Sequence, residues 1–177
     1  MKKFILILLP ILALVGCQSK TYYGAQSTNL QRFDGWQEEN AAFLMEANDL
    51  TLLLQNLSTL AMTEANRRDT YLTAEEAYPE FQNLLLDFKI EAAARRVKLS
   101  SVLSKDNDLI YQQLRTAQKD NFDSLYQKMM LQKMAELHDI SQEYTIKGHN
   151  DGLIGFGKKI INTLSPLREK IKALEMT

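Results

Sequence analysis

Apolar positions recur along most of the chain with the spacing that is typical of amphipathic α-helices. In the segment from about residue 37 to residue 68 they return at alternating intervals of four and three residues, at Phe43, Ala47, Leu50, Leu54, Leu57 and Ala61. A helix places such residues along one stripe. Because Leu53 and Leu60 widen the stripe, the pattern predicts a long helix that packs against several partner helices.

Three further segments show the same rhythm. The pattern predicts helices over about residues 79–103, 122–146 and 151–175, with a shorter helix within 109–118. Pro79 suits the first turn of its helix, where an N–H group is not needed. The apolar face of the last helix keeps its register across Pro166, so we expect one continuous, kinked helix there. Four long amphipathic helices with short connections predict an all-α, up-down four-helix bundle over residues 36–177.

The first sixteen residues have a different pattern. Lys2 and Lys3 precede an apolar run, Phe4 to Val15, that is interrupted only by Pro10. A charged start, a short apolar stretch and small residues at its end are typical of a signal peptide. A transmembrane helix needs roughly 17–25 residues, so the length of this run favours a signal peptide over residues 1–16.

The run ends in Leu14-Val15-Gly16-Cys17, a stretch that resembles the lipobox of bacterial lipoproteins. The resemblance implies cleavage before Cys17 and attachment of lipid to the thiol and the new amino group of that residue. Several acyl chains on one residue give stable membrane anchoring. An ordinary secretory peptide with a coincidental cysteine is the alternative. Asp after the lipidated cysteine usually signals retention in the inner membrane, so Gln18 favours the outer membrane.

Residues 18–35 are polar and have no helical period. We therefore expect the lipidated Cys17 and a flexible tether to occupy residues 17–35. As a random coil, a tether of this length would span roughly 25 Å. Trp36 comes directly after the tether, and two roles are open for it: contact with the membrane interface or a partner, or packing of the tether against the bundle.

Composition limits the partners. Without residues 1–16 the chain would keep 161 residues, with 19 basic and 22 acidic side chains. This balance lacks the basic surplus that nucleic-acid binding requires. Cys17 is the only cysteine, so no disulfide can form within the chain and packing alone must stabilise the domain.

Candidate catalytic and metal-ligating residues are few. A di-iron carboxylate bundle needs Glu-x-x-His pairs, and neither His138 nor His149 has a Glu three residues before it. We therefore expect no metal centre and no cofactor. We interpret His138, next to Asp139, as a surface histidine rather than a catalytic acid or base. The helix expected over 122–146 also carries three methionines, which we interpret as core residues rather than soft-metal ligands: Met129, Met130 and Met134.

Several short motifs occur in a distinctive order over residues 40–174. They are Phe43-x-x-x-Ala47 with Leu57-x-x-Leu60-Ala61, Phe122-Asp123-x-x-Tyr126 before a methionine pair, and Leu164-Ser165-Pro166-Leu167. Together they resemble the bacterial domain-of-unknown-function family 4142, which implies an exported, ferritin-like four-helix protein. The family pattern has Glu at Leu54 and histidines near Lys89, Met134 and Lys170. The resemblance therefore implies that this chain has largely lost any ligands of that kind.

These features predict an outer-membrane lipoprotein that faces the periplasm and whose non-catalytic helical bundle has a structural or protein-interaction role. The expected partners are the membrane, through lipid on Cys17, and another envelope protein. The alternative is a ferritin-like metal-binding or stress-protective protein, which metal analysis of the purified mature domain would separate from the first. A third hypothesis, an enzyme that uses His138 as a base, requires polar side chains that converge on His138.

Overall fold

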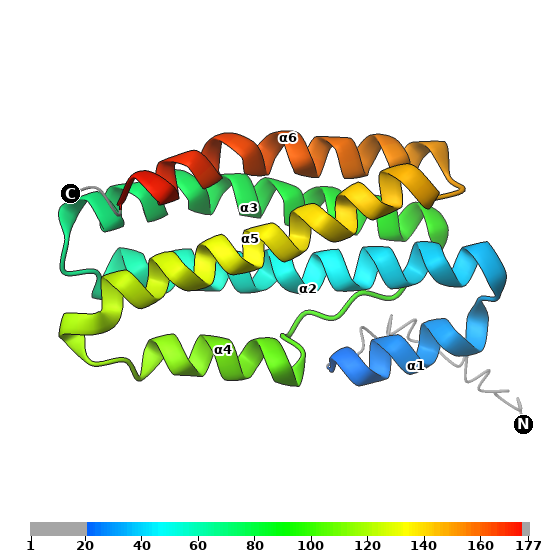
Figure 1. Cartoon of the computed structure of the whole chain (residues 1–177). Helices are drawn as coiled ribbons and strands as arrows, with labels where there is room; N and C mark the ends of the chain where they lie inside the picture. The colour runs from blue at the N-terminus through cyan, green and yellow to red at the C-terminus, as the bar shows by residue number, and fades with distance from the viewer. Residues whose placement is uncertain (1–20, 175–177) are drawn as a thin grey trace, which may run out of the picture.

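The computed structural model describes residues 21–174, and Figure 1 shows its helices. Within this range there are six α-helices, a single 3-10 turn at Lys119–Asn121 and no strand. The helices are α1 (Tyr22–Arg32), α2 (Gly35–Glu64), α3 (Arg68–Arg95), α4 (Lys105–Arg115), α5 (Phe122–Lys147) and α6 (Asp151–Ala173). The all-α prediction is confirmed: the described helices pack as a bundle.

Figure 1 shows that the four long helices α2, α3, α5 and α6 lie side by side, while α1 and α4 follow each other along one side of the bundle, next to α2. Two ion pairs show the relative direction of α3 and α6. An ion pair of 2.7 Å joins Lys159 of α6 to Asp87 of α3, and Lys170 pairs with Glu76 further along. As residue numbers rise along α6 they fall along α3, so these two helices are antiparallel.

The connection between α3 and α5 is long and passes along the side of the bundle. Residues 96–121 carry α4 beside α2 and return the chain, so that α5 runs in the same direction as α3 (Figure 1). The expectation of short connections and a simple alternation of helix direction is wrong here. The physical reason is that α4 and the preceding loop find partners on α2, which stabilise a crossover in place of a tight turn.

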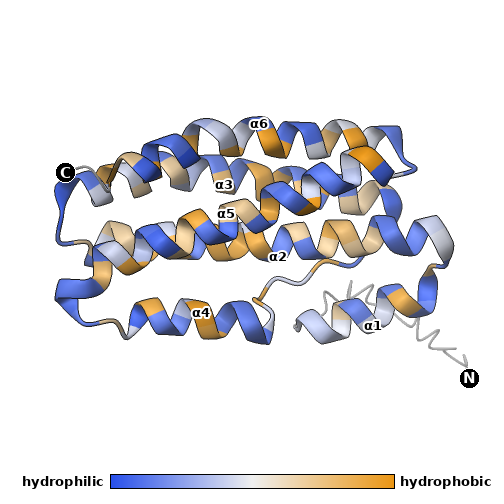
Figure 2. Cartoon of the chain, viewed as in Figure 1, coloured by the Kyte–Doolittle hydropathy of each residue, from blue (hydrophilic) through white to orange (hydrophobic). Residues whose placement is uncertain are grey.

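The core lies between the four long helices. Its fully buried side chains come from α2 (Leu53, Leu54, Leu57), α3 (Phe81, Phe88), α5 (Tyr126, Met130, Met134, Leu137) and α6 (Ile160, Ile171). Phe88 and Phe156 meet edge to face, with ring centroids 4.8 Å apart, a favourable geometry for aromatic pairs. Met129 is also buried, so the interpretation of the methionines as core residues is confirmed. Figure 2 shows the hydrophobic and hydrophilic positions interleaved along each long helix.

The last two helices begin and end close to where the sequence predicts. α5 begins at Phe122 and ends at Lys147, and a Cβ atom on the following Gly148 would lie 2.5 Å from the Tyr144 carbonyl oxygen. α6 begins after Asn150, whose side chain accepts a hydrogen bond of 3.1 Å from the Leu153 N–H. The helix continues through Pro166 to Ala173, which confirms the prediction of a continuous helix.

α3 differs from its predicted range at both ends. It begins at Arg68, includes Pro79 in its interior and ends at Arg95. The earlier start has a packing reason, because Thr70, Ala74 and Ala77 are buried and extend the apolar stripe by three turns. This burial offsets the one hydrogen bond that Pro79 removes.

α4 begins at Lys105, four residues before the predicted range. The Ser104 hydroxyl oxygen accepts a hydrogen bond of 3.3 Å from the Asn107 N–H and so caps the helix. A serine at this position satisfies an N–H group that has no partner within the helix. The polar residues after Ser104 therefore belong to the first turn of α4.

Residues 22–32 form α1, so the prediction of a flexible tether is wrong for this part of the chain. The Thr21 hydroxyl caps the helix by accepting a hydrogen bond from the Gly24 N–H. Ala25 and Asn29 face inward, with only 0% and 3% of their surface exposed. The side-chain amide of Asn29 donates a hydrogen bond of 2.8 Å to the Lys98 carbonyl oxygen and accepts one of 2.8 Å from the Lys98 N–H. We call this paired contact the Asn29 clamp.

Buried polar residues of α2 bind the rest of the loop that joins α3 to α4. The Asp49 carboxylate accepts hydrogen bonds of 2.8 Å from the Ser104 N–H and of 2.7 Å from the Asn107 side-chain amide. The amide of Asn48 donates to the Ser100 carbonyl oxygen over 3.3 Å. The loop that leads into α4 is therefore fixed to α1 and α2 together.

We predict that Asn29→Ala releases α1 from the bundle without unfolding the long helices. The change leaves the partly buried Lys98 N–H and carbonyl without their partners, and a backbone group that loses its partner costs up to about 1–3 kcal/mol when it is buried. Amide hydrogen exchange should accelerate over residues 22–32 and 97–104 and stay slow in α5. Gln26→Ala, at an exposed position of α1, is the control. Unchanged exchange in α1 of the Asn29 variant would contradict the clamp.

Candidate functional site

Cys17 and Gln18 lie outside the residues that the structure describes, which begin at Thr21. Lipidation of Cys17 therefore stays a prediction. The structure does describe α1, which follows the predicted anchor. The Asn29 clamp fixes α1 against the loop before α4.

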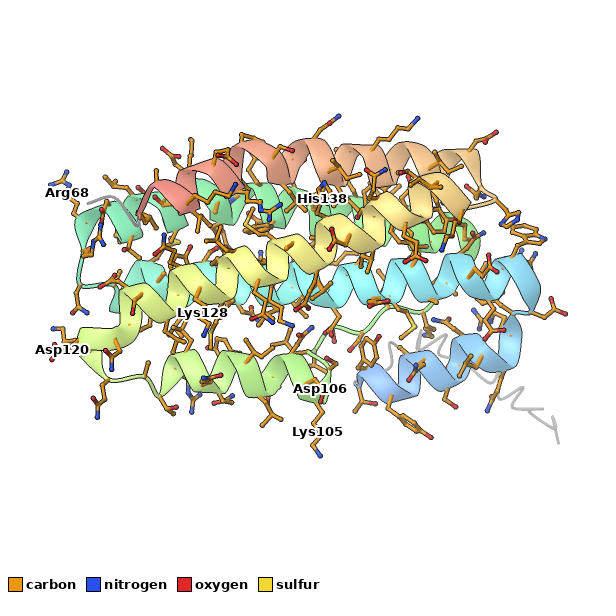
Figure 3. All side chains as sticks on the ribbon, viewed as in Figure 1. Arg68, Lys105, Asp106, Asp120, Lys128 and His138 are labelled. Carbon is orange, nitrogen blue, oxygen red and sulfur yellow. The ribbon has the colours of Figure 1, made fainter. Side chains whose placement is uncertain are left out.

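The two histidines lie apart and make only surface contacts. His138 projects from α5 (Figure 3), and its Nδ1 lies 3.2 Å from a carboxylate oxygen of the adjacent Asp139. His149 lies just after α5, and its Nδ1 is 3.5 Å from a Glu39 carboxylate oxygen. Asp139 is the one hydrogen-bond partner found for His138 among residues 21–174. The convergence of polar groups that an enzymatic base would need is not seen there.

The four positions at which the pattern of family 4142 has Glu or His do not form a site in this chain. Leu54 and Met134 are fully buried in the core, whereas Lys89 and Lys170 are exposed on the outside of α3 and α6. Within the described range, no group of three or more His, Cys, Asp or Glu side chains is placed to hold a metal ion. The centre of the bundle carries mostly hydrocarbon and thioether groups, together with a few buried hydroxyls such as those of Ser58, Tyr126 and Ser141.

The most distinctive polar surface is a groove between the start of α2 and the end of α5. It has a volume of about 430 Å³. Three carboxylates line it, two from α2 and one from α5, together with His149: Glu39, Glu46 and Glu143. We call this surface the acidic groove. Phe43 and Tyr144 form its apolar wall, with their rings stacked 4.1 Å apart and 15° from parallel.

The carboxylates of the acidic groove are only partly neutralised. Glu143 pairs with Lys147 at 2.8 Å, and Glu39 lies near His149. Glu46 has no ion-pair partner among residues 21–174. Partial burial, followed by the nearby carboxylates of Glu143 and Glu136, raises the pKa of Glu46 above its usual range. The groove therefore holds negative charge that a cationic group would stabilise.

Hydrogen bonding makes the wall of this groove rigid. The Tyr144 hydroxyl donates to the side-chain oxygen of the buried Asn40, which joins α5 to α2. Burial raises the pKa of Tyr144, so the phenol stays protonated and remains a donor at neutral pH. The carboxylates are thus held on two helices that are fixed relative to each other.

A second groove, between α3 and α6, has a volume of about 780 Å³ and a different charge balance. Its Lys159 and Lys170 pair with Asp87 and Glu76 across the groove. These pairs neutralise each other within the chain. The second groove is also lined by Glu80 and Lys158, whose charges have opposite sign, whereas the acidic groove has three carboxylates against Lys147 and His149. This excess of negative charge makes the acidic groove the better candidate for a binding surface.

The sequence contains a signal for the acidic groove that periodicity does not reveal. α2 has five acidic side chains and no lysine or arginine over thirty residues. A helix that is acidic on its exposed face is a source of local negative potential. Which other helix would complete the groove depends on the packing of α5 beside α2 and cannot be seen in the pattern.

Comparison with known proteins gives no relative. No protein-family model matches the chain, and neither a curated protein nor a solved structure matches it. None of the helices described between residues 21 and 174 is long and apolar enough to cross a membrane. Arguments about function therefore depend on the residues themselves.

We predict that Glu46→Gln stabilises the domain at neutral pH. A carboxyl group whose pKa is raised by folding binds more protons in the folded state, so the free energy of unfolding falls as the pH rises through that pKa. The substitution should raise the free energy of unfolding at pH 7 by up to about 1 kcal/mol. At pH 3, where the carboxyl is protonated in both states, it should have no effect.

Urea unfolding at the two pH values measures this difference. Glu169→Gln is the control of opposite sign, because Lys172 lowers the pKa of Glu169. A destabilising effect of Glu46→Gln at pH 7 would mean that Glu46 has a cationic partner in solution.

Proposed function

We propose that this chain is an outer-membrane lipoprotein whose helical bundle acts as a non-catalytic interaction module on the periplasmic side. The observation that carries the proposal is the stretch Leu14-Val15-Gly16-Cys17 at the end of a short apolar run. Lipid on Cys17 would anchor the domain, and Gln18 at the next position favours the outer membrane.

The topology of the bundle is compatible with a ferritin-like fold that lacks ferritin-like chemistry. One long crossover between the second and third long helices is the connection found in ferritin-like bundles, and residues 96–121 form such a crossover here. This is the fold that the resemblance to family 4142 implies. Leu54 and Met134 fill the core where that family has polar residues, which favours a scaffold over a metal site.

The acidic groove is the surface on which we expect the partner to bind. Its charge suits a cationic segment of another envelope protein, because Glu46 lacks a partner cation within the described chain and Glu39 and Glu143 lie in the same groove. The stacked rings of Phe43 and Tyr144 offer apolar contact beside that charge. Charge complementarity of this kind mainly determines specificity and the rate of association.

The anchor is tested by replacing Cys17 with Ser. We expect the wild-type protein in the membrane fraction, with the added mass of acyl chains on the mature N-terminus. The variant should lack that mass and leave the membrane fraction, because a few acyl chains supply the anchoring energy. A wild-type protein without acyl mass, or a variant that stays with the membrane, would contradict lipidation.

The binding surface is tested by photo-crosslinking in intact envelopes. A crosslinking residue at the exposed position of Ala42, in the acidic groove, should give an adduct with one partner protein, whereas the same residue at Ser165 on α6 should not. The adduct should disappear in Glu46→Lys with Glu143→Lys, provided that circular dichroism shows an intact bundle. Adducts at both positions, or an adduct that is insensitive to charge reversal, would exclude the acidic groove as the binding site.

A further inference from the structure

The short distance along the chain between Cys17 and the folded domain limits how the domain can lie on a membrane. The described structure begins at Thr21, which caps α1. Extended chain spans at most about 3.6 Å per residue, so four residues reach about 14 Å at most, whatever conformation they adopt. The start of α1 therefore lies within about 14 Å of the backbone of Cys17.

The Asn29 clamp makes this limit apply to the whole domain. It joins α1 to Lys98 through two hydrogen bonds, and an Arg32 guanidinium group donates a third, of 2.5 Å, to the Arg96 carbonyl oxygen. A free tether of residues 17–35 would let the bundle turn in any direction. A docked α1 fixes which side of the bundle is close to the anchor.

Figure 1 shows that side. The N-terminal ends of α1 and α4 meet beside the bundle, on the side opposite α6. A groove of about 640 Å³ lies between them, lined by Tyr22, Tyr23, Val102, Leu103, Lys105 and Tyr111. Figure 3 shows Lys105 projecting outward from the start of α4. We call this surface the α1–α4 face.

The side chains of the α1–α4 face suit the boundary between lipid and water. Tyr23 is 78% exposed, Val102 45% and, further along α4, Leu109 59%. Tyrosine rings favour the headgroup level of a bilayer, and the long stem of Lys105 can lie on apolar surface while its ammonium group stays hydrated. Asp106 and Asp108 outnumber Lys105 in the first turn of α4, so the face has no basic surplus that would select anionic lipids.

We propose that the α1–α4 face lies against the headgroup region of the membrane that holds the acyl chains of Cys17, so that the bundle lies with its long side along the bilayer. This proposal rests on the lipidation of Cys17 proposed above. α6, with five of its side chains basic, then faces away from the membrane.

The test uses the full mature lipoprotein in vesicles of phosphatidylethanolamine and phosphatidylglycerol. Because the only native cysteine carries lipid, a new cysteine can be labelled selectively with a fluorophore. Val102→Cys places the label on the α1–α4 face, and Ser165→Cys on α6 is the matched control at an exposed position. Lipids with a nitroxide on the headgroup quench labels that lie close to the bilayer surface.

We expect at least threefold stronger quenching of the label at position 102 than at position 165. Adding Asn29→Ala should reduce that difference, because α1 would then lengthen the tether.

Equal quenching at the two positions, in protein whose acyl mass is confirmed, would overturn the proposed orientation and leave lipidation intact. Absence of acyl mass would instead overturn lipidation. The label at position 102 is also measured in detergent, without vesicles. If it is as protected from solvent there as in vesicles, and if this protection increases with protein concentration, a second copy of the chain covers the face and the proposal is overturned.

Discussion

The crossover between α3 and α5 can pass along α2 only because buried polar side chains satisfy its backbone. Backbone N–H and carbonyl groups that leave water need partners. The carbonyl oxygens of Lys98 and Ser100 accept hydrogen bonds from the side-chain amides of Asn29 and Asn48. The Ser104 N–H donates one to the Asp49 carboxylate. Each partner is a short amide or carboxylate with a fixed geometry, so the contacts set the position of the loop as well as its stability. Both the placement of α1 and the start of α4 depend on them.

These contacts also explain which elements could be predicted from the sequence. α5 and α6 carry large apolar residues at nearly every turn, and the pattern predicts their ranges within two residues. The first half of α3 is buried through Thr70, Ala74 and Ala77, which contribute little to a hydrophobic pattern. α1 buries only Ala25 and Asn29. This helix is stabilised by a hydrogen bond from Asn29 to Lys98, which is 69 residues away in the chain. The spacing of apolar residues within a helix cannot predict such a distant contact.

The acidic groove depends on the topology in the same way. In a bundle with short connections throughout, the first long helix would lie between the second and the fourth. The crossover instead places α5 beside α2, where Asn40 accepts a hydrogen bond from Tyr144. Glu143 then lies in the same groove as Glu39 and Glu46. The acidic character of α2 is visible in the sequence, but the side chain that completes the groove depends on the order in which the helices pack.

The crossover also makes the two long sides of the bundle unlike. One side is covered by α1 and α4 (Figure 1), whereas the groove between α3 and α6 lies on another side. A lipid anchor just before α1 would place the covered side at the membrane, because the chain between them is too short to reach around the bundle. The segment after such an anchor would lose its conformational entropy once, when the domain folds, and not again each time a partner binds. A single loop, fixed by a few amide and carboxylate contacts, thus determines the helix that completes the acidic groove, and it would also determine the side from which lipid on Cys17 anchors the domain.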